Sequence, residues 1–273
     1  MGAVTGRFSC AEPNAQQIEK APNLFRDCYI ASGPDRILVA SDFKHIEMRT
    51  AAIFANAVTH LHTLLDLFKE GLDPHTMTAA AILHRGIEEV TKTNRQLAKA
   101  VNFGFVYGQQ ALGFLAYAKS NYGIVLSLPE AEQFRSEYFR QYPDLAGWHR
   151  WAWDQVENGV TESRTILGRR HLIPASTSKW NKFQALVNTP ASGSTADLIK
   201  WSMIELDRVL PSDTHQVMSV HDELVVDAPF CRAGEIKELM ERVMAETFAK
   251  LFDDIIPGPA GANFGPNWEV AKP

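Results

Sequence analysis

The sequence predicts an α+β fold in which a long helical segment is inserted between antiparallel strands that carry acidic residues. Two apolar, β-rich runs indicate the strands: ILVASDF at 37–43 and HQVMSVHDELVVDAP at 215–229, the second hinged at His221-Asp222. Between them, apolar residues recur at helical spacing over most of the chain. The sequence has no internal repeat and no low-complexity linker.

Breaker residues and apolar spacing predict the remaining elements. Residues 1–21, rich in Gly, Pro, Asn and Gln, are expected to be extended and loop-like, and a further strand is expected at 24–31. Asp73-Pro74 predicts a helix start, because Asp caps helices and Pro suits the first turn. In the first half of the chain, helices are expected at 46–69 (ending near Gly71), after Asp73, and at 91–108 (ending at Gly108). Residues 109–160 are expected to be helical, with breaks at Gly123, Pro129 and Pro143, and a β-hairpin is expected at 161–174. Further helices are expected at 180–210, with an interruption near Pro190 and Gly193, and at 233–252, before a Gly/Pro-rich tail up to Pro273.

The composition is that of an ordinary globular protein. The chain has 273 residues, 45% of them apolar and 22% charged, and no apolar run approaches the ~20 residues of a membrane span. The N-terminus has no basic-then-apolar secretion signal. Three widely separated cysteines form no CxxC pair, which favours a reduced compartment such as the cytosol or a virion interior. We therefore predict a cytoplasmic location, in a bacterial or phage-infected cell, with no membrane partner.

The net charge of −5, from 27 basic and 32 acidic side chains, gives no support to nucleic-acid binding by itself. Any DNA contact must come from a local basic surface, with the acidic residues gathered elsewhere. A cluster of carboxylates that holds metal ions is one place where they could gather.

The segment RQLAKAVNFGFVYG at 95–108 has four notable side chains at a spacing of four. Arg95, Lys99, Phe103 and Tyr107 would form one stripe on a helix, about 18 Å long at about 1.5 Å per residue. Two cations followed by two aromatic rings suit a ligand with a polyphosphate tail and a flat base. By spacing alone, a surface helix whose aromatic residues reach the core is the commoner explanation.

Acidic residues stand where two of the predicted strands end. Asp42 closes the run at 37–43, and Asp222 and Glu223 form the tip of the hairpin at 215–229. Carboxylates from adjacent strands can hold two divalent cations about 3.5–4 Å apart, and oxygen ligands suit Mg²⁺. Such a site would stabilise an in-line displacement at phosphorus. A turn or capping role for each Asp is the alternative.

Taken together, these segments resemble the DNA polymerase I-like (family A) DNA polymerases. The matching segments are VASDFKHIEMR at 39–49 and VMSVHDELVV at 217–226 for the two palm motifs, RQLAKAVNFGFVYG for the fingers helix, and TGRFSCAEPNAQQI at 5–18, DPHTMTAA, LGRRHLIP, VNTPASGSTADLIK and NW at 267–268 for supporting motifs. They follow in the family's order over nearly the whole chain. The resemblance implies a right-hand polymerase palm, an antiparallel sheet with flanking helices, and an inserted, mainly helical fingers subdomain.

The resemblance also implies the site residues. The implied metal ligands for two Mg²⁺ ions, for which Mn²⁺ can substitute, are Asp42, Asp222 and the backbone carbonyl of Phe43. The implied nucleotide contacts are Arg95, Lys99, Phe103, Tyr107, Glu47, His75 and His45. Lys99 joins the aspartates as a catalytic residue because it would stabilise charge on the transferred phosphoryl group. Glu47 would exclude a ribose 2′-hydroxyl. Glu223, also taken as catalytic, would either hold the metal site through water or form a salt bridge.

DNA contacts follow from the same resemblance. Arg7 would reach the primer end through the minor groove, Arg169 and Asn188 lie in segments that track the template and primer, and His221 would be structural or near the primer terminus. The sequence departs from the family at four positions: Lys44 and His45 replace a common Ser-Gln, Ser192 a usual Gln, and Gln184 a usual Arg.

The implied domains are a first palm segment at 1–48, the fingers at 49–185 and a second palm segment at 186–273. The implied activity is template-directed transfer of a deoxynucleoside monophosphate from a dNTP to a primer 3′-hydroxyl by two-metal-ion catalysis, with primer-template DNA as partner. Because the TGR motif begins at residue 5, we expect the family's thumb and exonuclease segments to be missing before it. We therefore expect weak processivity, unless a separate thumb, exonuclease or processivity subunit assists.

Two other functions fit some of the same residues. A single-subunit RNA polymerase shares the palm acids and the fingers Lys and Tyr, although Glu47 and His221-Asp222-Glu223 favour deoxynucleotides. A partner-dependent or non-catalytic DNA-binding remnant is the second alternative, against which the retained acids and cations argue.

Overall fold

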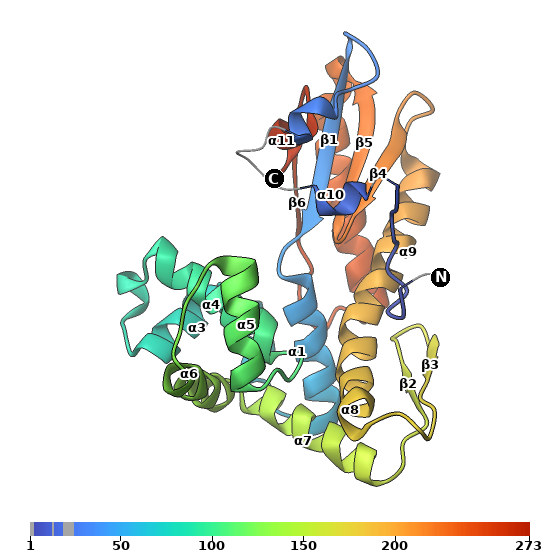
Figure 1. Cartoon of the computed structure of the whole chain (residues 1–273). Helices are drawn as coiled ribbons and strands as arrows, with labels where there is room; N and C mark the ends of the chain where they lie inside the picture. Colours follow the sequence, from blue (N-terminus) through green and yellow to red (C-terminus); the bar gives the residue numbers. More distant parts are fainter. Residues whose placement is uncertain (1–2, 13, 19–24) are drawn as a thin grey trace. The chain divides into compact units, whose positions relative to one another are not determined.

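The computed structural model describes residues 3–12, 14–18 and 25–273. The chain forms two compact units, Met1–Ile46 with Ser192–Pro273 and Glu47–Ala191. We call them the sheet unit and the helical unit (Figure 1). Among the described helices, none is long and apolar enough to cross a membrane.

The sheet unit is built on four antiparallel strands that lie side by side in the order β4-β5-β1-β6 (Figure 1). The strands are β1 (Arg36–Phe43), β4 (His215–Val220), β5 (Glu223–Pro229) and β6 (Ala260–Gly265). β1 pairs with β5 so that Ala40 is opposite Val225 and Asp42 is opposite Glu223. Strands β1 and β5 are central, and nearly all of their residues are buried, as expected for strands covered on both faces.

Helices cover the sheet. Helix α10 (Ala233–Leu251) packs along β1 and β6 and against α9 (Ser194–Val209), and the short α11 (Trp268–Ala271) packs on β1, β6 and the 3₁₀ turn η2 (Phe25–Cys28). Six buried side chains form the core between α11 and the sheet: Leu38, Ala40, Val220, Val225, Trp268 and Ala271. Since alternate residues of a strand face the same side, Asp42 shares the face of Leu38 and Ala40.

The helical unit contains most of the helices. They are α1 (Ile46–Thr59), α2 (Thr63–Lys69), α3 (Pro74–Leu83), α4 (Lys92–Phe105), α5 (Ala111–Tyr122), α6 (Leu128–Gln141), α7 (Pro143–Glu157) and α8 (Lys179–Asn188). The first residue of α1 belongs to the sheet unit. The helical unit also contains a two-stranded ribbon of β2 (Glu162–Arg164) and β3 (Arg170–Leu172). Helices α3, α4, α5 and α6 pack on one another. A π-helical turn, Thr189–Gly193, leads from α8 to α9.

Several predicted boundaries are confirmed. The Asp73 side chain caps α3 by accepting hydrogen bonds from two backbone N–H groups, and Pro74 occupies the first turn. Gly108 follows α4 with φ of +81°, and a Cβ there would lie 2.3 Å from the Phe183 ring. Only glycine fits both constraints without strain.

Other predicted elements are wrong. The predicted helix at 46–69 is two helices, because His60 adopts φ of +59° and ends the first. The predicted strand at 24–31 is largely the 3₁₀ turn η2, and its first residue lies outside the described residues. The loop-like segment at 1–21 contains a short 3₁₀ turn, Ala15–Gln17, and the tail contains β6 and α11.

A buried histidine should make the helical unit sensitive to acid. His149 Nε2 donates to the Val106 carbonyl at 2.9 Å, and burial, which outweighs this hydrogen bond, lowers the pKa of His149 to about 4. The unfolded chain then binds more protons than the folded chain between pH 6.5 and 4, so stability falls as the pH falls through this range. The loss should reach about 3 kcal/mol.

Urea unfolding at a series of pH values checks this expectation. His149→Gln, which keeps a donor but does not titrate, should show a flatter dependence on pH below 6.5. Equal slopes for the two proteins would contradict the assignment.

Candidate active site

Two carboxylates meet where β1 and the β4–β5 hairpin end. Asp42 is the next-to-last residue of β1, and Asp222 lies in the turn between β4 and β5. His221 makes this tight turn with φ of +57°, a conformation that His tolerates better than most residues. The backbone N–H of Phe43 donates to the Asp222 carbonyl at 3.4 Å, which joins the two strand ends.

The electrostatics of this pair favour a bound cation. Burial, followed by repulsion from Asp222, raises the pKa of Asp42 to about 7, and burial also raises the pKa of Asp222. Asp42 Oδ1 is buried and has no hydrogen-bond partner among the described residues. An oxygen without a donor, beside a second carboxylate, fits a hard divalent ion such as Mg²⁺. Within the described residues, no group of three or more His, Cys, Asp or Glu side chains is placed to hold a metal, so further ligands would have to be backbone, water or substrate oxygens.

Glu223 is held by the protein itself. Its carboxylate is 1% exposed, accepts a hydrogen bond from Trp268 Nε1 and forms an ion pair with Lys272. The Lys272 ammonium also lies 4.0 Å from Asp42 Oδ2. Of the two roles predicted for Glu223, these contacts favour the salt bridge over a metal-linked catalytic role, because both carboxylate oxygens already have donors.

Arg7 and His221 lie close to this pair. The positive charge of Arg7 lowers the pKa of Asp222 against the larger effect of burial, and burial lowers the pKa of His221, with Arg7 adding to the shift. The segment that carries Arg7 is tied to the sheet unit, since Lys200 Nζ donates to the Gly6 carbonyl at 2.6 Å. The sheet unit therefore brings the two predicted carboxylate ligands together with two of the predicted DNA contacts.

In the helical unit, α4 carries the predicted cations. The Arg95 guanidinium already has a partner within the protein. Its Nε and Nη2 donate to the Asp73 carboxylate at 2.7 and 3.2 Å. Asp73 also caps α3, so this fork ties α4 to the start of α3. Lys99, one turn further along α4, is half-buried, and its ammonium forms none of the ion pairs found in the described part of the chain.

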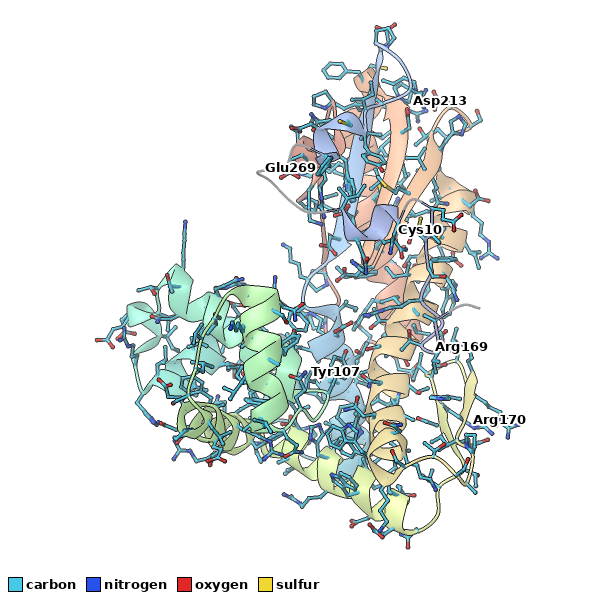
Figure 2. The ribbon with its side chains drawn as sticks, in the orientation of Figure 1. Cys10, Tyr107, Arg169, Arg170, Asp213 and Glu269 are labelled. Atoms are coloured by element: carbon cyan, nitrogen blue, oxygen red, sulfur yellow. The ribbon has the colours of Figure 1, made fainter. Side chains whose placement is uncertain are left out.

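The aromatic half of the predicted stripe is divided between the helix and the turn after it. Phe103 lies in α4 with its ring centroid 5.9 Å from that of His75, which is only 3% exposed. Tyr107 lies beyond Phe105, the last residue of α4 (Figure 2), and Gln184 Nε2 donates to its carbonyl at 2.9 Å. Their spacing predicted that the four residues lie on one helix, but only Arg95, Lys99 and Phe103 lie on α4.

The other predicted contacts lie on separate elements. His45 precedes α1 in a turn with φ of +54°, and Glu47 occupies the first turn of α1. Arg169 lies on the β2–β3 ribbon (Figure 2), where its backbone N–H donates to Thr165 Oγ1 at 3.2 Å. Asn188 is the last residue of α8, and its amide donates to Gln184 Oε1 at 3.4 Å.

Sequence reasoning missed three residues around these sites. Lys272 lies against the carboxylate pair, Asp73 holds Arg95, and Asn102 contacts His75 through its buried amide. The sequence predicts that Asp73 caps α3, but it does not predict that the same carboxylate binds Arg95. The other two depend on partners 230 and 27 residues away for which the local pattern gives no signal.

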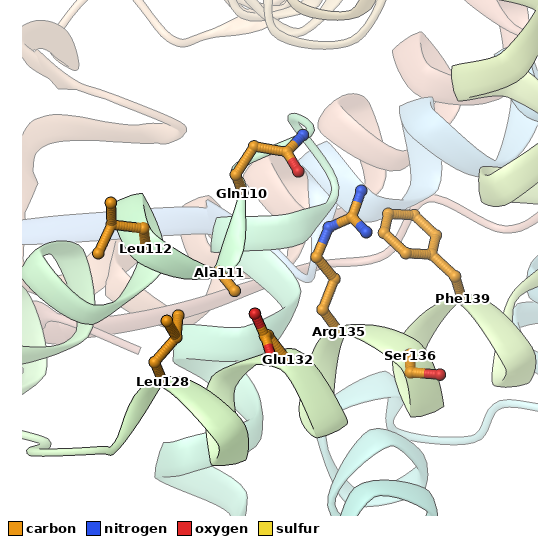
Figure 3. Close-up of a pocket in the computed structure, with 8 residues that line it drawn as sticks. All are labelled: Gln110, Ala111, Leu112, Leu128, Glu132, Arg135, Ser136 and Phe139. Atoms are coloured by element: carbon orange, nitrogen blue, oxygen red, sulfur yellow. The ribbon is translucent and has the colours of Figure 1, made fainter.

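A cavity of about 550 Å³ lies in the helical unit, between the start of α5 and one face of α6 (Figure 3). Its lining residues are Gln110, Ala111, Leu112, Leu128, Glu132, Arg135, Ser136 and Phe139. None of the predicted site residues lines it.

Comparison with solved structures defines the class of protein. The structure is similar, with a TM-score of 0.85 and 28% identity, to the polymerase domain of Pol1 from M. smegmatis, which was solved in complex with DNA primer-template and dNTP. The match covers 98% of this chain and 47% of that chain. The antiparallel sheet with its helical insertion is therefore the fold of a polymerase domain, as predicted. The family model for DNA polymerase family A matches residues 1–270, and the chain belongs to this family.

Similar curated proteins support the same family. DNA polymerase I of Aquifex aeolicus is 37% identical over 272 residues, and that of Geobacillus stearothermophilus is 34% identical over 289 residues. Each match covers 98% of this chain but only 45% and 30% of the relative. The chain thus spans less than half the length of these relatives.

Proposed function

We propose that this chain carries out template-directed DNA synthesis, by transfer of a deoxynucleoside monophosphate from a dNTP to a primer 3′-hydroxyl. The observation that carries the proposal is the Asp42–Asp222 pair, with a buried Asp42 oxygen that lacks a donor, in a member of DNA polymerase family A. The residues present fit a pair of Mg²⁺ ions. When bound, these would act as Lewis acids on the attacking hydroxyl and the transferred phosphoryl group.

The sheet unit supplies the metal ligands in this proposal. Asp42 and Asp222 would bind through carboxylate oxygens and Phe43 through its carbonyl. Lys272 and Trp268 keep the Glu223 carboxylate in place beside them. Arg7 and His221 of the sheet unit would contact the primer end, and Arg169 and Asn188 of the helical unit would contact the template and primer.

The helical unit supplies the nucleotide contacts. Arg95 and Lys99 would bind the triphosphate, with Lys99 stabilising charge on the phosphoryl group as it moves. Because the Asp73 carboxylate occupies the Arg95 fork, the triphosphate would have to share or replace this partner. Phe103 and Tyr107 would stack near the base and sugar, and Glu47 would exclude a 2′-hydroxyl. His75 would contribute a polar contact, as would His45 of the sheet unit.

A primer-extension assay of the purified chain tests the proposal. With Mg²⁺ or Mn²⁺, dNTPs should be added in template order, whereas rNTPs should be added far more slowly and EDTA should stop the reaction. Preference for rNTPs would favour the RNA polymerase alternative. No extension under any condition, with DNA binding retained, would favour the non-catalytic alternative.

The processivity, the partners and the location of the chain can each be measured. A polymerase trap added with the dNTPs measures how many nucleotides are added per binding event, and we expect few. Products that lengthen when a second polypeptide is added would indicate a separate thumb, exonuclease or processivity subunit. The predicted cytoplasmic location would be tested by fractionation of cells that express the chain.

Phe103→Tyr should increase the incorporation of dideoxynucleotides relative to deoxynucleotides. A Tyr hydroxyl would stand close to the sugar of the bound nucleotide and could replace the missing 3′-hydroxyl as a hydrogen-bond partner. Competition between ddNTP and dNTP in primer extension measures the ratio. Phe114→Tyr, a buried substitution on α5, is the control; an unchanged ratio in the Phe103 variant would contradict the prediction.

A further inference from the structure

The ammonium of Lys272 lies beside two carboxylates of the candidate active site. It forms an ion pair with Glu223 and is 4.0 Å from Asp42 Oδ2. Asp42 and Glu223 are opposite each other on β1 and β5, so their side chains share one face of the sheet. Asp222 directly precedes Glu223 in the chain. The end of these strands therefore gathers three carboxylates, with the Lys272 charge next to two of them.

The docking of α11 fixes the position of this ammonium. Trp268, the first residue of α11, is fully buried, and its ring centroid is 5.6 Å from that of Tyr29 in a T-shaped contact. The Arg26 guanidinium lies over the same ring, 4.3 Å from its centroid. Lys272 directly follows α11, and its side chain is 22% exposed. The charge of Lys272 is therefore held next to the carboxylates and does not move freely in solvent.

Both carboxylate oxygens of Glu223 are occupied by donors. Trp268 Nε1 donates to Oε1, and Lys272 Nζ donates to Oε2. Glu223 is therefore not placed to become a ligand of an ion that Asp42 and Asp222 bind. Its negative charge still acts on such an ion, because charges at a buried site interact over several ångströms and are screened less by salt. Glu223 can thus influence a metal ion through charge without touching it.

The two partners of this ion pair would act on a bound ion in opposite directions. A divalent ion held by Asp42 and Asp222 would be repelled by the Lys272 ammonium and attracted by the Glu223 carboxylate. The affinity of a site for hard cations depends strongly on the charge that surrounds the ion. With both partners present, their effects largely cancel, so removal of either one alone should change the affinity.

We infer that the Lys272–Glu223 ion pair sets the affinity of the proposed metal site by charge: Lys272 weakens the binding of divalent ions to Asp42 and Asp222, and Glu223 strengthens it. Neither side chain ligates the ion. The inference rests on the proposed function for the identity of the site. Ion binding can nevertheless be measured without DNA or nucleotide, so the test does not require DNA synthesis.

The first experiment measures the binding of Mn²⁺ to the purified chain by the loss of the EPR signal of the free ion. Lys272→Met should lower the Kd for Mn²⁺ about tenfold, which is what a unit charge a few ångströms from a divalent ion amounts to even in water. Lys272→Arg, which keeps the charge, should leave the Kd within about threefold of the wild type. Lys250→Met, an exposed lysine on α10, is the control and should not change it.

A double variant separates an effect of charge from an effect on folding. Glu223→Gln keeps an oxygen that can accept from Trp268 but loses the charge, so the Kd for Mn²⁺ should rise about tenfold. Glu223→Gln combined with Lys272→Met restores the net charge, and the Kd should return to within about threefold of the wild type. If the ion pair only stabilised the fold, both single variants would bind Mn²⁺ more weakly and the double variant would not recover. That result would overturn the inference.

The comparison of Glu223→Gln with the double variant removes the Lys272 charge without leaving a buried carboxylate unpaired, so it decides the inference even if Lys272→Met does not fold. Asp222→Asn shows where Mn²⁺ binds. An unchanged Kd in that variant would refute the proposed metal site and the inference together. If Asp222→Asn abolishes binding but removal of Lys272 does not tighten it, the inference alone fails. Absence of primer extension by the wild-type chain would refute the proposed function, and the Mn²⁺ titrations would still decide the inference.

Discussion

Asp222→Asn should reduce nucleotide transfer at least about a thousandfold. Asp42 and Asp222 would hold the divalent ions, which would stabilise charge on the transferred phosphoryl group by several kcal/mol, and each 1.36 kcal/mol corresponds to a factor of about ten in rate. Asn keeps the shape of Asp but removes the charge that binds the ion. Single-turnover primer extension with saturating DNA and Mg²⁺ measures the loss.

The same variant should fold at least as well as the wild type when no divalent ion is present. Burial and mutual repulsion disfavour the charged forms of Asp42 and Asp222, so neutralising one of them relieves this cost. Thermal unfolding in EDTA should therefore show no loss of stability, and the stabilisation that Mg²⁺ confers on the wild type should disappear. Asp207→Asn, an exposed carboxylate on α9, is the control for both measurements. Activity within tenfold of the wild type would exclude Asp222 as a metal ligand.

Lys99→Ala should slow the chemical step by about a hundredfold to a thousandfold. An ammonium beside the transferred phosphate stabilises the developing charge and can protonate the leaving pyrophosphate, and such proton transfer typically contributes 10²–10⁴-fold. Arg95 does not occupy the same place, because it lies one turn earlier on α4, beside Asp73 at the start of α3. Rapid-quench measurement over a range of dNTP concentrations separates the maximal rate from the apparent nucleotide affinity.

The expected signature is a large fall in the maximal rate with a smaller change in affinity. Lys92→Ala, at the exposed start of the same helix, should change neither. An effect confined to affinity would mean that Lys99 only binds the triphosphate in the ground state.

Local patterns predicted those parts of the fold that local forces determine. The strand at 37–43 and the hairpin at 215–229 are apolar runs bounded by charged or turn residues, and both are confirmed. The start of α3 follows from Asp73, whose capping side chain acts on its own neighbours. These elements need no distant contact to be recognised.

The errors occur where distant contacts decide the structure. Helical apolar spacing continues across His60, so the pattern shows no break there, although the backbone turns. The tail at 253–273 is rich in Gly and Pro, yet Ala260–Gly265 pairs with the open edge of β1. In the site, Asp42 and Asp222 were predicted because charges at apolar strand ends are conspicuous. Lys272 was not, because only the docking of α11 brings it to them.

The ion pair between Lys272 and Glu223 has a practical consequence for anyone who handles the protein. Removing Lys272, for example by trimming with a carboxypeptidase, would leave the Glu223 carboxylate, which is 1% exposed, without its ion-pair partner. The loss of one partner of a buried ion pair typically lowers the free energy of unfolding by about 3–5 kcal/mol. A purification tag fused after Pro273 would begin one residue from that contact. Tags and labels are therefore better placed on an exposed surface such as the outer side of α6 than at this terminus.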